Sequence, residues 1–316
     1  MSTAPQFSIV VPTWNRRETL EVVLPALLSL DFAPDGYEVL LCDSGSTDGT
    51  AELVERLRAT LDNPDRLRLF SGPNRGRAGA RNAGIREARG HFVLFTDADI
   101  IADPRLLVEH ARIHAEGPCA VVGREVQVDT LDEYETVKAQ PAAGRTLHPD
   151  TRKTLSWLYF LTGNASVPRQ TLIDVGGFDE AFTGYGHEDL ELGYRLRQHG
   201  VTIRYNPRAV NYHWHPVSFP EKCEKMKLAG LSTVRFYQKH QDARIKLLLG
   251  WNPVSLGMHR LLSVNRRMVA ALERKSADSK ICSELVLQFH YLNGVREGMR
   301  SLQPPPPQGR ASAPGA

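Results

Sequence analysis

Two aspartates, Asp97 and Asp99, stand two residues apart at the end of an apolar run, His91–Thr96. Carboxylate oxygens are the ligands that Mg²⁺ and Mn²⁺ prefer in proteins, and a diphosphate can supply further oxygens to the same ion. An acidic turn or a helix N-cap is the simpler explanation of such a pair taken alone, because Asp103 and Pro104 are typical of a following helix start. The pair becomes informative only beside other polar groups.

Two histidines supply such groups. His213 and His215 follow an apolar run, Ala209–Tyr212, so in an extended chain both imidazoles lie on one face. A metal held by Asp99, one of these histidines and a diphosphate would have mixed oxygen and nitrogen ligands, which Mn²⁺ accepts. A pair of surface histidines is the alternative, but together with the acidic pair we expect a Mn²⁺ or Mg²⁺ site.

A second acidic pair, Glu188 and Asp189, opens a predicted helix over Asp189–His199, directly after the glycine-containing loop Phe182–Gly186. Acidic residues are favoured at helix N-termini, so capping alone explains them. Capping does not explain the glycines, which would let a ligand approach the backbone closely. A carboxylate at this place could act as general base on a hydroxyl group.

Three arginines, Arg75, Arg77 and Arg81, stand beside glycines at the start of another predicted helix, Gly79–Ala88. Guanidinium groups and helix N-termini both bind phosphate, and a solvated basic turn is the alternative. We favour phosphate binding slightly, because glycine weakens a helix start unless close approach is needed.

The elements that must position these residues alternate regularly. Four apolar runs predict strands, and the segments between them have helical spacing. The strands are Phe7–Val11, Tyr37–Cys42, Leu67–Phe70 and His91–Thr96, and the helices are Glu18–Leu30, Thr50–Leu61 and Gly79–Ala88. This alternation predicts an α/β fold with a mostly parallel sheet flanked by helices, in which ligands bind beyond the carboxyl ends of the strands.

The pattern loosens after Cys119. We expect further strands over Ala120–Val128, Leu161–Val167 and Val201–Asn206, and a C-terminal helical extension beyond Pro220.

Charge divides the chain near Pro220. Residues 1–220 carry 23 Lys and Arg against 29 Asp and Glu, a net charge of −6, and residues 221–316 carry 16 against 7, a net charge of +9. We therefore expect a catalytic domain over 1–220, a basic helical extension over 221–302 and a disordered proline-rich tail over 303–316. Within the extension, Pro253 should divide Ile245–Leu262 into two short amphipathic helices.

Two explanations compete for this basic extension. It could lie on an anionic membrane surface, or it could be a dimer interface or an ordinary helical cap, which is the more common outcome. Four widely spaced cysteines and the lack of a signal peptide or a membrane-spanning stretch favour a cytoplasmic protein, with peripheral contact at the inner face of the membrane as a further expectation. We expect no nucleic-acid partner and leave oligomerisation open.

Eight segments in order make the sequence resemble family 2 glycosyltransferases of the GT-A fold. They are VPTWNR (11–16), DSGSTDGT (43–50), NRGRAGARNAGI (74–85), TDAD (96–99), GNASVPR (163–169), VGGFDE (175–180), GHEDLELGYRL (186–196) and the late His213. The resemblance covers about residues 7–216, and 221–316 carry no motif that matches.

The resemblance implies roles for the donor site. Pro12, Thr13 and Asp43 would hold the base and ribose of a nucleoside-diphosphate sugar, UDP being the favoured nucleotide, and Arg81 would sit near the nucleotide. Gly163 and Asn164 would line the sugar pocket. By the same resemblance Asp99 ligates Mn²⁺ or Mg²⁺, Asp97 faces the ribose and the metal, and a late histidine completes the site, with His213 placed ahead of His215.

The resemblance also implies the reaction, inverting single displacement by a hexosyltransferase of polysaccharide biosynthesis. Asp189 would be the base, and Glu188 would bind hydroxyls of a glycan or lipid-linked acceptor. Two alternatives remain open, a nucleotidyltransferase and a non-catalytic module that binds sugar nucleotides. The sugar and the acceptor stay undetermined, because sugar choice depends on loops such as Ala139–Thr154.

Overall fold

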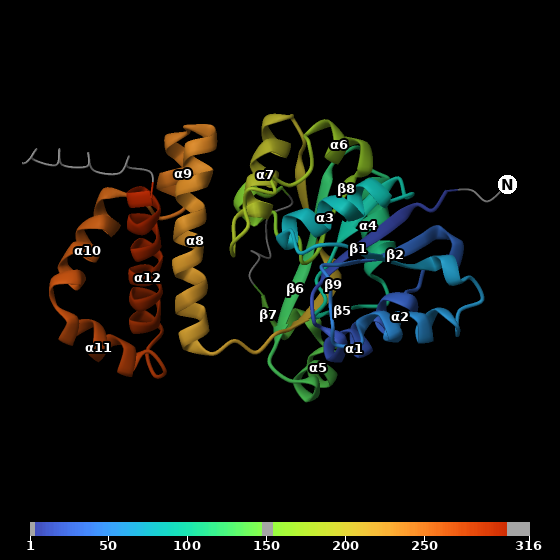
Figure 1. Ribbon diagram of the computed structural model, residues 1–316, viewed down its shortest axis with the longest axis horizontal. Coiled ribbons are helices and arrows are strands. Elements are labelled where there is room, and N and C mark those ends of the chain that lie inside the picture. Colours follow the sequence, from blue (N-terminus) through green and yellow to red (C-terminus); the bar gives the residue numbers. More distant parts are fainter. Residues whose placement is uncertain (1–3, 147–153, 302–316) are drawn as a thin grey trace, which may run out of the picture. The chain divides into compact units, whose positions relative to one another are not determined.

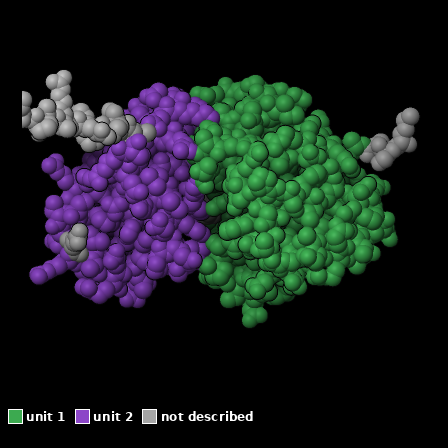
Figure 2. Space-filling view, viewed as in Figure 1, with its two compact units in different colours: residues 1–183, 188–216 green, residues 184–187, 217–316 purple. Residues whose placement is uncertain are grey.

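The computed structural model describes residues 4–146 and 154–301, which form two compact units. The sheet unit comprises the described residues of 1–183 and 188–216, and the helical unit comprises those of 184–187 and 217–316 (Figure 2). The predicted tail, 303–316, and the central part of the loop Ala139–Thr154 lie outside the described residues.

A nine-stranded sheet forms the centre of the sheet unit (Figure 1). Its first four strands are parallel and lie in the order β3-β2-β1-β4. They are β1 (Phe7–Thr13), β2 (Tyr37–Asp43), β3 (Leu67–Ser71) and β4 (Phe92–Phe95). The predicted α/β fold is confirmed, and all four strands end at the edge where the predicted site residues follow.

The other half of the sheet is mixed in direction. It continues from β4 through β8 (Ala165–Pro168), β6 (Ala120–Val128) and β9 (Ile203–Trp214) to the three-residue strand β5 (Ile100–Ala102), and β7 (Arg145–Thr146) pairs with β6. Strand β8 begins later than predicted, after a 3₁₀ turn. The strand predicted at 201–206 and the apolar run 209–212 both lie in the single strand β9, whose register against β6 shifts between Gly123 and Arg124.

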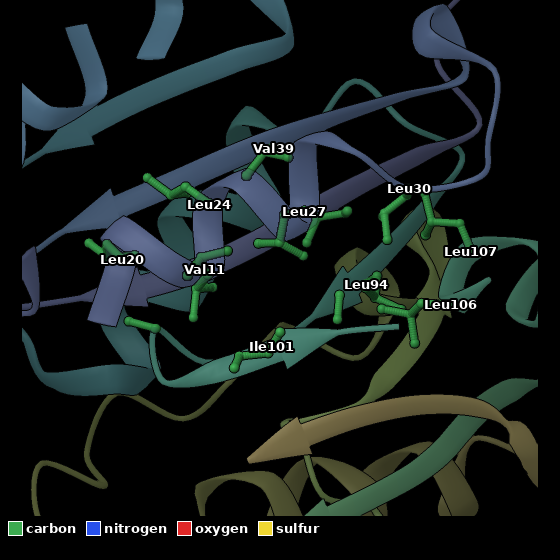
Figure 3. Close-up of a cluster of buried hydrophobic side chains, with 14 of the residues drawn as sticks. Val11, Leu20, Leu24, Leu27, Leu30, Val39, Leu94, Ile101, Leu106 and Leu107 are labelled. Carbon is green, nitrogen blue, oxygen red and sulfur yellow. The ribbon is translucent and has the colours of Figure 1, made fainter. Parts of the chain in front are cut away.

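Helices cover both faces of this sheet, because successive side chains of a strand point to opposite faces. Odd-numbered residues of β1 pack with α1 (Arg17–Leu28), α2 (Thr50–Arg58) and α4 (Leu106–His114), in the core shown in Figure 3. Val10 points the other way, toward a core that includes side chains of α3 (Gly76–Glu87), α6 (Arg169–Asp174) and α7 (Glu188–Gln198). The short helix α5 (Leu131–Val137) follows β6. Packing in these two cores holds the strands in place, and with them the positions at which the strands end.

The helical unit contains five helices. They are α8 (Phe219–His240), α9 (Ala243–Leu248), α10 (Pro253–Val264), α11 (Arg266–Lys275) and α12 (Lys280–Ser301). Helices α8 and α12 pack closely at Gly230 and Gly294, where a Cβ would lie 2.0 and 1.8 Å from backbone oxygens of the other helix. Pro253 separates two helices as predicted, and it occupies the first turn of α10, where its missing N–H is tolerated. No described helix is long and apolar enough to cross a membrane.

Candidate active site

Asp97 and Asp99 lie in the turn that joins β4 to β5. The Ile100 amide donates to the Asp97 carbonyl at 3.1 Å, and the Trp214 amide donates to the Asp99 carbonyl at 2.9 Å. Strand β5 pairs antiparallel with β9, which places Ile100 opposite His213. This pairing brings the acidic pair to the end of β9, more than a hundred residues later in the chain.

Both late histidines face Asp99. Nε2 of His213 lies 3.6 Å from Oδ1 of Asp99, and Nδ1 of His215 lies 3.4 Å from Oδ2. Their rings stack in parallel with centroids 5.5 Å apart, as expected for two residues at a spacing of two. The structure therefore joins the two predicted motifs into one cluster.

Glu125 on β6 supports His213 from the other side of its ring. Oε1 of Glu125 lies 3.2 Å from Nδ1 of His213 and also accepts a hydrogen bond from Gln127. Burial alone would lower the pKa of His213, but the hydrogen bond and charge of Glu125, with the charges of Asp99 and Asp97, raise it to about 9. These carboxylates thus favour the protonated imidazole, which must lose a proton before it can ligate a metal ion.

The side chains of this cluster supply only some of the ligands that a divalent cation requires. Within the described residues, no three His, Cys, Asp or Glu side chains are grouped closely enough to hold a metal ion. Burial and the charge of Asp97 raise the pKa of Asp99, and a positive charge placed beside Asp99 would favour its ionised form. One carboxylate and one or two imidazoles match a site to which a diphosphate contributes the remaining oxygens.

A buried arginine connects this cluster to the second acidic pair. Nη2 of Arg81, on α3, donates to Oδ1 of Asp97 at 2.7 Å, and its Nη1 donates to Oε1 of Glu188 at 3.2 Å. Only 2% of the Arg81 side chain is exposed. Burial alone would raise the pKa of Asp97, but the charge of Arg81, with Arg77 and His213, lowers it. Arg81 thus favours the ionised form of Asp97 and holds Glu188 by a hydrogen bond.

Glu188 and Asp189 differ in exposure. Glu188 is buried against Arg81, whereas Asp189 is half-buried at the N-terminus of α7. Burial raises the pKa of Asp189 to about 7, with a further contribution from the charge of Glu188 and opposition from Arg81. Asp189 is therefore the accessible carboxyl of the pair, and its pKa suits proton transfer near neutral pH.

The loops after β1 and β2 are tied to each other. The Asn15 amide donates to the Ser46 hydroxyl at 2.7 Å, and the Arg17 amide donates to Asp48 at 2.8 Å. Asp43 accepts from the Ser46 amide and hydroxyl, so its carboxylate shapes its own loop. Beside it Thr13 Oγ1 is buried and has no hydrogen-bond partner among the described residues, and Pro12 precedes it in β1.

The predicted sugar-pocket residues have different surroundings. A Cβ on Gly163 would lie 2.1 Å from Oε2 of Glu125, so this glycine leaves room for the carboxylate that supports His213. Asn164 is buried, and its amide donates to the Arg124 and Ala209 carbonyls, which flank the register shift of β6 and β9. The Asn164 side chain therefore holds strands together.

Glu125 is the functional residue that the sequence analysis missed. It lies within the segment predicted as a strand, Ala120–Val128, and a buried glutamate in a strand requires a partner. Once the strand was predicted, Glu125 could have been recognised as a buried carboxylate in need of a partner. Which residue is that partner depends on the pairing of β6 with β9.

Two family models match this chain. The model described as glycosyl transferase family 2 matches residues 8–178, and the model described as the N-terminal domain of galactosyltransferase matches residues 147–216. Together they span the β strands and loops that carry the site residues.

Curated relatives agree with this match. The chain is 29% identical to validoxylamine A glucosyltransferase of Streptomyces hygroscopicus subsp. limoneus, an alignment that covers 90% of this chain and 68% of that protein. It is 24% identical to chondroitin synthase of Escherichia coli, over 92% of this chain and 49% of that protein.

Solved structures share the fold. A mannosyltransferase from Pyrobaculum calidifontis, in complex with GDP-Man and Mn²⁺, superposes with a TM-score of 0.67 at 19% identity, covering 96% of this chain and 89% of that one. Residues 1–349 of TarS from S. aureus, in complex with UDP, give a TM-score of 0.55 at 21% identity, covering 94% of this chain and 92% of that one.

Proposed function

Because the chain belongs to glycosyl transferase family 2, we propose that it is an inverting, divalent-metal-dependent hexosyltransferase that moves a sugar from a nucleoside diphosphate to a hydroxyl group. The observation that carries the proposal is the environment of Asp189. It is a half-buried carboxyl with a pKa raised to about 7, in the same unit as Asp97, Asp99 and His213.

Asp189 removes the proton from the acceptor hydroxyl, whose oxygen then attacks C1 of the sugar as the bond to the diphosphate breaks. A single displacement of this kind inverts the configuration at C1. Arg81 holds the side chain of Glu188 in place by a hydrogen bond, and Asp189, whose pKa is raised to about 7, is the carboxyl that can exchange a proton near neutral pH.

Asp99 and His213 would hold Mn²⁺ or Mg²⁺ together with the diphosphate, and Asp97 would face the ribose and the same ion. Such an ion neutralises charge on a departing diphosphate. Pro12, Thr13 and Asp43 are proposed for the nucleoside, with Thr13 Oγ1 and its unused hydrogen-bonding capacity among the described residues as the supporting feature. UDP is the proposed nucleotide, in line with the UDP-bound TarS structure.

The acceptor is proposed to be a glycan or a lipid-linked sugar. Chondroitin synthase and poly-beta-1,6-N-acetyl-D-glucosamine synthase of Staphylococcus aureus, 28% identical over 64% of this chain, are named for polymers, which supports the first choice. The cytoplasm is the proposed compartment, since all four cysteines are free thiols.

A thermal-shift panel of nucleotides and nucleoside-diphosphate sugars, with and without Mn²⁺, tests the donor assignment directly. We expect UDP-sugars to raise Tm only when Mn²⁺ is present. Incubation with the best donor and a panel of glycan acceptors should then release a nucleoside diphosphate. Release of pyrophosphate from a nucleoside triphosphate would favour a nucleotidyltransferase, and donor binding without turnover on any acceptor would favour a binding module.

A further inference from the structure

Helix α10 exposes a row of apolar residues to solvent, which is unusual for a helix at the surface of a protein. Val254, Leu261 and Val264 are exposed by 83, 64 and 79%. With Gly257 between them they follow a spacing of three and four residues, so they form one continuous stripe, about 15 Å long. We call these four residues the α10 stripe.

The opposite face of α10 is already in use. His259 is buried, its Nε2 lies 2.8 Å from Oδ1 of Asn293, and its ring stacks on Phe289 at 5.1 Å, both residues being on α12. Ser255 and Leu262 are buried on the same side. Because α10 is held to α12 by this face, the α10 stripe cannot turn inward without breaking these contacts.

Basic residues flank the stripe in the sequence, and acidic residues are missing from the same stretch. Residues 243–272 contain five Lys and Arg and no Asp or Glu. Arg260 and Arg267 are exposed next to the stripe in sequence, while Arg244 pairs with Asp242 just before the stretch. On α9, which precedes α10, Leu247 and Leu248 are exposed by 64 and 50%. Apolar and cationic side chains thus share one short segment.

We propose that the α10 stripe and its flanking arginines bind the surface of an anionic lipid bilayer. Exposed aliphatic side chains can enter the interface, while the cations contact anionic headgroups. A second copy of the chain is a poorer occupant, because a two-fold dimer would place the same cationic segment against itself. The inference does not require the proposed transferase activity, although it would bring the enzyme to a lipid-linked acceptor.

Vesicle co-sedimentation of the full chain tests this surface. Wild-type protein should bind vesicles that contain phosphatidylglycerol at low salt, bind them less at high salt, and bind pure phosphatidylcholine vesicles weakly. The double variant Leu261→Glu/Val264→Glu should lower the partition coefficient at least about tenfold, because it removes two apolar contacts and adds repulsion. Arg260→Gln/Arg267→Gln should weaken binding and flatten its salt dependence.

Ile173→Glu is the matched control, since Ile173 is an aliphatic residue exposed by 45% on α6 of the sheet unit. It should bind vesicles like the wild type, and circular dichroism should report an unchanged fold for every variant. The proposal is overturned if wild-type protein ignores anionic vesicles at low salt, or if Leu261→Glu/Val264→Glu binds as the wild type does. A dimer in sedimentation velocity that the double variant abolishes, without vesicle binding by either protein, would assign the stripe to self-association instead.

Discussion

Oε1 of Glu125 lies 3.2 Å from Nδ1 of His213, and on the other side of the ring Nε2 lies 3.6 Å from Oδ1 of Asp99. Because Nδ1 donates to Glu125, the ring is held with Nε2 toward Asp99. A carboxylate that fixes an imidazole in this way both orients it and makes it more basic. His213 therefore has a carboxylate support within hydrogen-bonding distance, which is consistent with its proposed role as a metal ligand.

Replacing Glu125 by Gln should lower the pKa of His213 from about 9 toward the ordinary value of 6.5, because both the hydrogen bond to a carboxylate and its charge are lost. An NMR titration of the His213 ring signals measures this directly. Glu116→Gln, which alters a surface ion pair with Arg204, is the control and should leave the titration of His213 where it is. An unshifted His213 in the Glu125 variant would mean that Asp99 and Asp97 alone set its basicity.

Arg81→Met should destabilise the fold by about 3–5 kcal/mol, because Asp97 and Glu188 would lose the cation that compensates them. Urea unfolding at neutral pH gives the free energy of unfolding. Arg145→Met is the matched control: its pair with Asp129 is exposed by 59% on both sides and should contribute at most about 1 kcal/mol. Equal losses in the two variants would contradict a central role for Arg81 in holding the two carboxylates.

The sequence was sufficient to predict the order of strands and helices, since apolar runs followed by polar loops determine both. It was also sufficient to predict that the two late histidines share a face, because that depends only on their spacing. The sequence indicated a common metal site for Asp99 and one of these histidines, but its periodicity did not show how the chain brings them into contact. That contact requires β5, a three-residue strand of Ile100–Ala102 too short to give a periodic signal, to pair with β9.

Ion pairs between residues far apart in the chain could not be predicted from the sequence, for a related reason. Arg81 and Glu188 are 107 positions apart, and each looks like an ordinary helix-terminal charge in its own segment. The sequence favoured phosphate binding by the arginines of this helix, whereas the structure uses the guanidinium of Arg81 to join two carboxylates. Local sequence patterns show which charged side chains lie at each helix. Which of these side chains form ion pairs with one another depends on how α3 and α7 are placed in the fold.

The pH dependence of transfer should follow Asp189. If Asp189 is the general base, it must be ionised, so kcat/KM should rise with pH up to about 7 and stay level above it. Asp189→Asn should keep donor binding in the thermal-shift assay and lose at least about a hundredfold in kcat. Asp174→Asn, an exposed carboxyl on α6 of the same unit, should leave kcat unchanged. Normal turnover by Asp189→Asn would remove the base assignment while leaving the donor site intact.

Acid should destabilise the sheet unit through two buried histidines, His110 and His114, both hydrogen-bonded to Ser166. Burial lowers the pKa of His110 to about 4 and that of His114 to about 3, below the ordinary value of 6.5. A proton therefore binds the unfolded chain more tightly. The stability that these neutral rings provide is complete above pH 6.5 and is lost as the pH falls toward 4, by about 2 kcal/mol for each histidine at pH 5.

His114→Phe tests this linkage, because the new ring can keep the stacking on Phe92, whose ring centroid lies 3.9 Å from that of His114, but cannot take up a proton. Free energies of unfolding from urea titrations near pH 7.5 and pH 5 should differ less in this variant than in wild-type protein, by about 2 kcal/mol. His199→Phe, an exposed histidine after α7, should retain the wild-type pH dependence. If His114→Phe and wild-type protein lost the same stability on acidification, His114 would have to titrate alike in the folded and unfolded chain, and the neutral state of the buried ring would be wrong.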